Sequence, residues 1–211
     1  MKFILGKKIG MTHIFNEKGE QVPVTLVFSD GCVVSQVKNK EKDKYTAVQV
    51  AFEKVKEKNV PKPVLGHLKS KKIEGAFRYL REFRVPENEV QNFKEGSVIT
   101  VDVFKPGDIV KVSGISKGKM FQGGVKRWGF SGRSETHGVK HEHRTIGSVG
   151  TQGLGKVLKG KRMPGRTGGV RVTQRNLEVV LVDKENNILG IKGSVPGRKD
   201  TLLKIESIDN K

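Results

Sequence analysis

The sequence predicts a mainly β protein, with a small barrel or sandwich body that one long basic segment interrupts. Three observations support this prediction. Short runs rich in β-branched residues, bounded by turn residues, occupy both ends of the 211-residue chain. Between them, residues 117–173 are rich in glycine and cations and have no apolar period. A third stretch, about residues 53–84, has the apolar spacing of short helices.

The β-type runs lie on both sides of the basic segment. They span residues 22–28, 32–37, 45–52, 98–104 and 108–112 before it, and 177–182, 188–191 and 202–205 after it. Several alternate apolar and polar residues, and turn residues at 29–31, 105–108 and 184–187 separate them. Many short strands with such turns favour a barrel or a sandwich. We therefore assign residues 1–116 and 174–211 to one β body.

The stretch at about residues 53–84 differs from these runs. Pro61 and Pro63 are followed by large apolar residues, mostly three to five positions apart. These residues are Val64, Leu65, Leu68, Ile73, Phe77, Leu80 and Phe83. The pattern predicts one or two short helices inserted between strands of the body.

The charge is concentrated in the middle of the chain. Lys and Arg number 41 against 22 Asp and Glu, for a formal charge of +19 and an isoelectric point near 10.1. Residues 117–175 hold fourteen of these cations, 14 of the 26 glycines and only two acids, Glu135 and Glu142. Such a segment cannot bury enough apolar surface to offset its ordering entropy, so residues 117–173 are expected to form an extended loop. The charge predicts a polyanionic partner, and nucleic acid is preferred over an anionic membrane surface. No amphipathic helix or lipid anchor supports binding to a membrane.

Composition also excludes several classes. The single cysteine, Cys32, rules out an internal disulfide framework and a cysteine-cluster zinc site, and its β-rich surroundings predict a small core residue. No apolar stretch approaches the roughly 18 residues of a membrane-spanning helix. The N-terminus has no signal-peptide core, so a cytoplasmic location is expected.

Two short stretches combine cations, glycine and aromatic residues, namely Ser116–Lys119 and Val125–Phe130. Glycine lets the backbone approach a phosphate, cations neutralise it, and an aromatic ring can stack on an unpaired base. The alternative is a solvated loop with Trp128 packed onto the body. The concentrated charge favours RNA contact. The predicted RNA-binding residues are Lys117, Lys119, Lys126, Arg127, Trp128, Arg133, His137, Lys140, His141, His143, Arg144, Lys156, Lys159, Lys161, Arg162 and Arg166.

Other chemistries fit the segment poorly. Gly155–Lys161 matches the start of a phosphate-binding loop, but Arg162 replaces the Ser or Thr that holds magnesium, and residues 163–165 stop a helix. His137, His141 and His143 resemble metal ligands, yet no cysteine lies near them and charged residues separate them. Contact with nucleic acid, or packing within the loop, is the preferred interpretation. We predict no catalytic residue, metal or cofactor.

Several ordered motifs cover nearly the whole chain, from Phe3 to about Gly197. They are Gly6–Phe15, Lys62–Pro63, Gly66–His67, Arg81–Arg84, Ser113–Gly123, Lys126–Trp128, Thr136–Gly138, Gly147–Gly150, Gly155–Val157, Lys159–Gly165 and Ile191–Gly197. Together these motifs resemble one family, the universal large-subunit ribosomal protein number three, in its bacterial branch. Three positions depart from the family pattern. Met120 replaces a usual glycine, Lys111 a common Asp or Asn, and Leu154 a common proline in a tip one residue shorter than usual.

The resemblance implies a translation-factor-like β-barrel body on the solvent side of the large subunit and a loop that runs through ribosomal RNA. It implies no enzymatic activity, binding early in assembly near the end of the large RNA, and neighbours such as the L-fourteen and L-nineteen families. The implied loop tip near the peptidyl-transferase centre comprises Ser148, Gly150, Thr151, Gln152 and Gly153. Gln152 aligns with a glutamine that is N-methylated in some bacterial members.

Two other hypotheses stay open on the sequence. One is an RNA-modifying or translation-associated enzyme with a β-barrel RNA-binding domain, although the acidic residues that such chemistry needs are nearly missing from the basic segment. The other is a free-standing nucleic-acid chaperone. Only an assembled ribosomal protein is expected to stay with the large subunit through a high-salt gradient.

Overall fold

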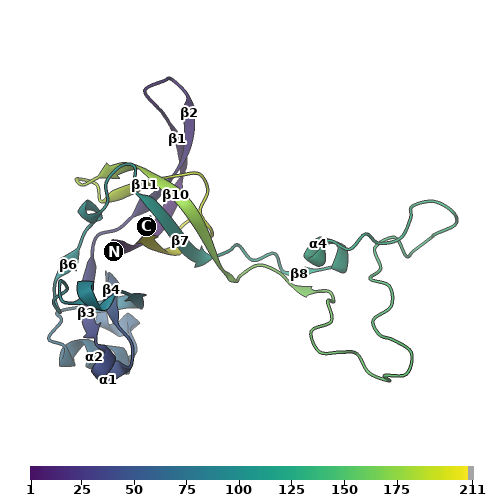
Figure 1. Cartoon of the computed structure of the whole chain (residues 1–211), viewed down its shortest axis with the longest axis horizontal. Coiled ribbons are helices and arrows are strands. Elements are labelled where there is room, and N and C mark those ends of the chain that lie inside the picture. The colour runs from purple at the N-terminus through teal and green to yellow at the C-terminus, as the bar shows by residue number, and fades with distance from the viewer. Residues whose placement is uncertain (209–211) are drawn as a thin grey trace. The chain divides into compact units, whose positions relative to one another are not determined.

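The computed structural model describes residues 1–208 and confirms a mainly β protein (Figure 1). The strands are β1 (Phe3–Phe15), β2 (Gln21–Phe28), β3 (Cys32–Lys38), β4 (Ala47–Val55), β5 (Ala76–Arg84), β6 (Val98–Ile99), β7 (Ile109–Ile115), β8 (Phe121–Gln122), β9 (Gly165–Arg166), β10 (Arg171–Asp183), β11 (Ile188–Lys192) and β12 (Leu202–Ser207). The α-helices are α1 (Lys40–Asp43), α2 (Lys62–Ser70), α3 (Glu87–Val90) and α4 (Gly124–Trp128), and short 3-10 turns cover Glu57–Asn59 and Val101–Val103. None of the helices in residues 1–208 has the length and apolar character needed to span a bilayer.

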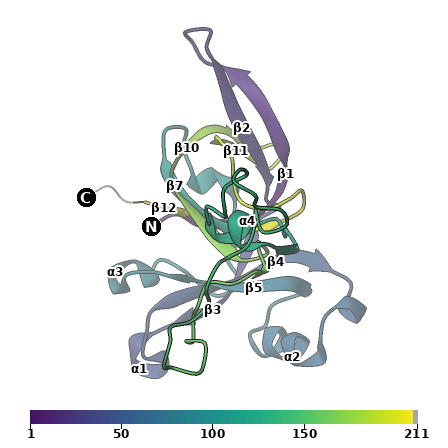
Figure 2. The same cartoon turned by 90° about the vertical axis from the view of Figure 1, so that its right-hand side faces the viewer.

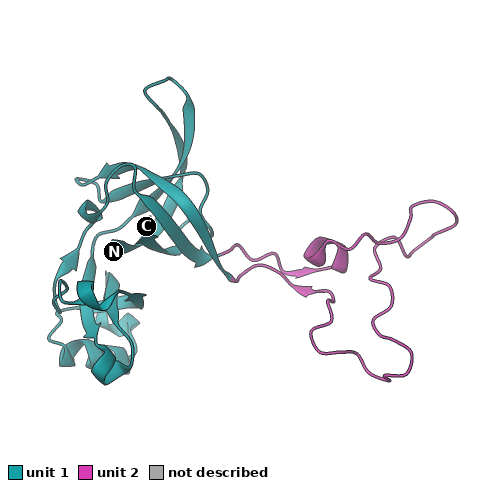
Figure 3. Ribbon diagram, viewed as in Figure 1, with its two compact units in different colours: residues 1–115, 171–211 teal, residues 116–170 magenta. Residues whose placement is uncertain are grey.

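The chain divides into two compact units (Figure 3). Unit 1 consists of residues 1–115 and the chain from residue 171 onward, and unit 2 consists of residues 116–170. Arg171–Thr173, which we expected in the loop, pair instead with Ile115, Gly114 and Ser113 of β7. These three residues therefore extend a strand of unit 1.

In unit 1, six antiparallel strands hydrogen-bond in the closed order β1-β12-β7-β10-β11-β2. The ring closes because β1 bonds to β12 through Phe3–Lys7 and to β2 from Lys7 onward. Sequence analysis missed β1, since Gly6, Lys7, Lys8 and Gly10 interrupt its apolar pattern. Gly6 is required there, because a Cβ atom would lie 2.5 Å from Val27 Cγ1 and 2.9 Å from the Phe28 carbonyl oxygen.

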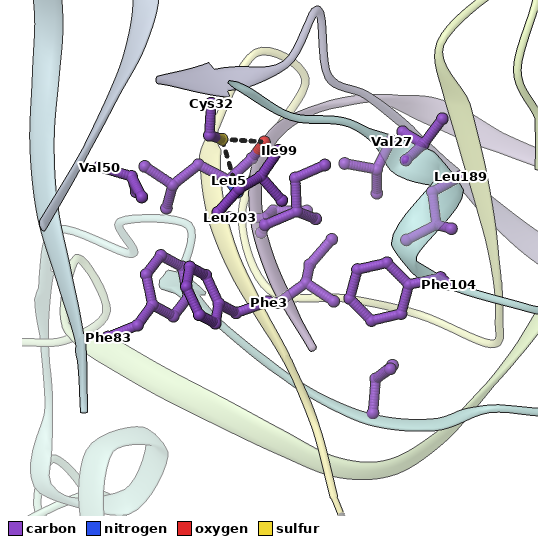
Figure 4. Packing of buried hydrophobic residues seen from close by; sticks show 14 of the residues in the cluster. Phe3, Leu5, Val27, Cys32, Val50, Phe83, Ile99, Phe104, Leu189 and Leu203 are labelled. Atoms are coloured by element: carbon purple, nitrogen blue, oxygen red, sulfur yellow. Dashed lines mark hydrogen bonds between the residues drawn. The ribbon is translucent and has the colours of Figure 1, made fainter. Parts of the chain in front are cut away.

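A second sheet in unit 1 has the order β5-β4-β3-β6. Its inner face shares one apolar core with the ring, where the Phe3 and Phe83 rings stack at 4.3 Å between centroids (Figure 4). Cys32 is fully buried in this core, as expected, and accepts a hydrogen bond from the Leu5 amide at 3.3 Å. Burial raises the pKa of the Cys32 thiol to about 12, so this cysteine is unreactive at neutral pH.

The stretch at 53–84 is only partly helical. Helix α2 forms after Pro61 and buries Leu68, but Ala76–Arg84 is strand β5, so the helix prediction is wrong there. Phe77, Leu80 and Phe83 have helix-like spacing, yet β5 pairs with β4 along its whole length. This pairing is non-local and overrides the local pattern. The run at 98–104 is also shorter than expected, since β6 ends at Ile99 and a 3-10 turn follows.

Candidate nucleic-acid interface

Unit 2 begins and ends in a two-stranded ribbon, in which β8 pairs with β9. The pairing continues beyond the strands. The Lys119 amide donates to the Thr167 carbonyl at 2.8 Å, and the Thr167 amide donates to the Met120 carbonyl at 2.9 Å. The two ends of the basic segment are therefore held together, and Lys117, Lys119 and Arg166 lie exposed along this ribbon.

Helix α4 follows the ribbon and presents Arg127 and Trp128. The Arg127 Nη1 and the Trp128 Nε1 both donate to the Met163 carbonyl oxygen, at 2.8 and 2.9 Å. The guanidinium carbons of Arg127 and Arg162 lie 4.8 and 5.5 Å from the centre of the Trp128 ring, within cation–π range. Trp128 is thus held by contacts within unit 2 and remains 40% exposed.

Close backbone packing fixes a second point in the unit. Gly124 is buried, and a Cβ atom there would lie 2.3 Å from Ile146 Cγ2 and 2.9 Å from the Phe130 ring. At Gly132 the Cβ atom would lie 2.2 Å from the His143 carbonyl oxygen, which accepts a hydrogen bond from the Arg133 amide. Sequence reasoning missed these contacts and the role of the Met163 carbonyl, because backbone groups and sparse apolar residues leave no periodic signal.

The predicted cations of the segment face solvent. Those classed as exposed are Lys117, Lys119, Lys126, Arg133, Lys140, Arg144, Lys156, Lys159, Lys161, Arg162 and Arg166, and Arg127 is half-buried. Within the described chain, one ion pair involves this set, between Arg133 and Glu142. The positive charge of unit 2 is therefore almost uncompensated by its own acids, which creates a strong field for a polyanion.

The three predicted histidines do not converge. His137 and His141 are exposed, and the ring of half-buried His143 lies 3.3 Å from the Ser134 carbonyl oxygen. No group of three His, Cys, Asp or Glu side chains with metal-binding geometry occurs in residues 1–208. His143 instead lines a shallow pocket together with Arg133, Glu135 and Arg144.

The residues at 148–156 are exposed except for half-buried Val149. The Ser148 hydroxyl donates to the Gly150 carbonyl at 2.8 Å, which closes a small turn just before Thr151 and Gln152. Gly153 has a φ of +98°, a conformation that side chains disfavour. After the phosphate-loop match at Gly155–Lys161, residues 162–164 form neither helix nor strand.

Comparison with known proteins agrees with this arrangement. Residues 31–187 match the family model described as ribosomal protein L3. The chain is 48% identical over 209 residues to "Large ribosomal subunit protein uL3" of Pseudothermotoga lettingae, covering 98% of this chain and 97% of that protein. Proteins of the same name from Thermotoga petrophila and Desulfitobacterium hafniense are 50% and 48% identical, over 98% and 96% of this chain and 97% and 93% of their own lengths.

These matches, with the β body and the basic segment, define a structural protein of the large ribosomal subunit rather than an enzyme. The chain belongs to the ribosomal protein L3 family. It is accordingly a component of the bacterial ribosome in the cytoplasm, as expected.

Proposed function

We propose that unit 2 binds large-subunit ribosomal RNA through its exposed cations. The observation that supports this best is the set of exposed Lys and Arg side chains with almost no acidic partner within the unit. Glycines along the segment allow close approach to phosphates, and His137, His141 and His143 line the same stretch of chain. Arg127 and Trp128 combine RNA contact with a structural role, since both also hold Met163.

The salt dependence of RNA binding tests this proposal. If about eight to ten of the cations meet phosphates, the log–log slope of affinity against salt is about −6 to −9. Replacing Lys159, Lys161 and Arg162 together by Gln should flatten the slope by about two to three. A matched triple variant of the body cations Lys42, Lys56 and Lys58, exposed on unit 1, should leave it unchanged. An equal effect of both triples would contradict the proposal.

We further propose that unit 2 forms the extended, RNA-penetrating loop of the family, with Ser148–Gly153 near the peptidyl-transferase centre. The turn closed by Ser148 supports this, because the exposed Thr151 and Gln152 follow it, midway along the chain between two basic limbs. In the assembled subunit, a new charge buried there without a partner is costly. Gln152→Glu should therefore lower the rate of peptide-bond formation, or change sensitivity to drugs of that centre, without changing the melting temperature of the free protein.

Three finer assignments rest on the family resemblance. We propose that the closed ring of strands is a translation-factor-like barrel that binds early in assembly, and the antiparallel strand order supports the barrel. We also propose the L-fourteen and L-nineteen families as neighbours. Gln152 is the proposed N-methylation site, and its exposure supports access by a modifying enzyme. Mass spectrometry of the tryptic peptide containing Gln152 should show one added methyl group in the native protein.

A further inference from the structure

The hairpin formed by β1 and β2 extends beyond the closed ring (Figure 2). Strand β1 pairs with β12 only through Phe3–Lys7, and β2 pairs with β11 only from Val24 to Phe28. In this extension β1 is paired with β2 alone, with His13, Ile14 and Phe15 opposite Pro23, Val22 and Gln21. A two-stranded hairpin is marginally stable in water on its own, so a cover over this extension would stabilise it.

One face of the extension is apolar and uncovered. Met11, His13 and Phe15 alternate along β1 and therefore share a face. Met11 and Phe15 are 52% and 67% exposed, and the rings of His13 and Phe15 meet edge to face at 5.7 Å. Pro23 lies opposite His13 and is also exposed. Aromatic and methionine side chains on one face are typical of the centre of a protein interface.

The charge of the hairpin turn distinguishes between an RNA and a protein partner. The only charged residues from Gly10 to Pro23 are Glu17, Lys18 and Glu20, a net charge of −1 in a chain of +19. The turn is also ordered, because the Asn16 side chain accepts from the amides of Lys18 and Glu20 and donates to the Glu20 carboxylate at 2.8 Å. An ordered acidic turn repels phosphates and attracts cations.

We propose that the Met11–His13–Phe15 face and the acidic turn form a docking site for a basic protein of the large subunit. The apolar face supplies the buried anchor, and Glu17 and Glu20 supply the complementary charge. Pro23 lacks an amide hydrogen, which disfavours strand addition along β2, and the exposed Met11 and Phe15 side chains favour docking on the face. The inference uses the ribosomal membership of the chain and is independent of the RNA contacts proposed for unit 2.

Photo-crosslinking in assembled subunits tests the site. The photoreactive amino acid benzoylphenylalanine is placed at Phe15, and at Val98 of β6 as a control that is 59% exposed on unit 1. After irradiation of sedimented large subunits, mass spectrometry should identify one basic large-subunit protein attached at position 15, and a different adduct or none at position 98. If the Phe15 variant does not enter subunits, the probe is placed at Met11 instead.

Charge reversal gives the second arm of the test. Glu17→Lys should reduce the yield of the position-15 adduct several-fold, whereas Glu185→Lys, the same charge change in the exposed turn between β10 and β11, should not. An adduct with ribosomal RNA, with a second copy of this chain or with an acidic protein would overturn the proposal. So would the absence of any protein adduct, or an equal yield in both charge variants. The salt dependence of RNA binding by unit 2 is measured on the free protein, whereas the crosslinks are measured in assembled subunits. Failure of the RNA proposal is therefore distinguishable from failure of the docking proposal.

Discussion

Arg127→Met should loosen unit 2 without destabilising unit 1. The substitution removes the Nη1 donor that lies 2.8 Å from the Met163 carbonyl and the guanidinium 4.8 Å from the centre of the Trp128 ring. Trp128 still donates to the same carbonyl at 2.9 Å, so the connection is weakened rather than lost. Methionine keeps the apolar part of the side chain, which limits the change to the polar contacts.

The magnitude follows from these two contacts. A hydrogen bond from a charged donor contributes about 1.5 kcal/mol at a half-buried site, and an exposed cation–π contact contributes about 0.5 kcal/mol. A total near 2 kcal/mol corresponds to about a 30-fold increase in local opening. Trp128 is the only tryptophan of the chain, so its fluorescence reports on this site alone. Acrylamide quenching should increase in the variant. The backbone amides at positions 127 and 129 donate to the carbonyls of Gly123 and Val125, and their hydrogen exchange should accelerate by about the same 30-fold.

Lys126→Met is the matched control. Lys126 is exposed on the same helix, and its substitution removes the same charge. The hydrogen bond between Trp128 and Met163 is kept. Its quenching and exchange should equal those of the unchanged protein. If both variants behaved alike, or if Arg127→Met lowered the melting temperature of unit 1, the assigned role of Arg127 would be refuted.

Three further outcomes are expected. Met120 has a φ of +58°, so Met120→Gly should relieve about 1 kcal/mol of backbone strain and slow exchange of the Thr167 amide, and faster exchange would contradict this. Burial opposes ionisation of Glu82, but hydrogen bonds from Lys38 and Tyr45 outweigh it and place the pKa below its usual 4.5. The stability that this carboxylate adds is therefore fully present above about pH 4.5 and is lost as the pH falls through the lowered pKa. In urea titrations, Glu82→Gln should lower the free energy of unfolding by about 1 kcal/mol at pH 7 and by less at pH 3. Trypsin should cut the free protein first between residues 117 and 166, and first cuts between residues 20 and 52 would count against that.

The sequence predicted those parts of the fold in which local pattern and tertiary pairing agree. The runs around β3, β7, β11 and β12 have β-branched residues at strand spacing and pair as such. Strand β1 was missed because a glycine interrupts its apolar pattern at position 6. That glycine is needed because a Cβ atom there would clash with Val27, which lies twenty-one positions away in the chain. Strand β5 was taken for helix because its pairing with β4, which is distant in the chain, is likewise invisible to a local pattern.

The candidate interface was predictable as a composition and not as a structure. The excess of Lys and Arg over acidic residues in the segment predicts exposed cations, because a segment with so little apolar surface cannot bury them. The carbonyl of Met163 and the contact of Gly124 with Ile146 order the segment, yet neither residue type signals its role. The hairpin face at Phe15 was missed for the same reason as β1.

Directed cleavage of ribosomal RNA tests the central claim most directly. Cys32 is fully buried and its thiol pKa is raised to about 12, so a cysteine introduced by Gln152→Cys can be labelled selectively with an iron chelate. Asn186→Cys, in the exposed turn between β10 and β11, serves as the control. In assembled large subunits, hydroxyl radicals from position 152 should cut RNA of the peptidyl-transferase centre, and radicals from position 186 should not. Cleavage of other RNA from position 152 would contradict the placement of the tip near that centre, and the absence of cleavage would contradict the placement of the basic segment inside ribosomal RNA.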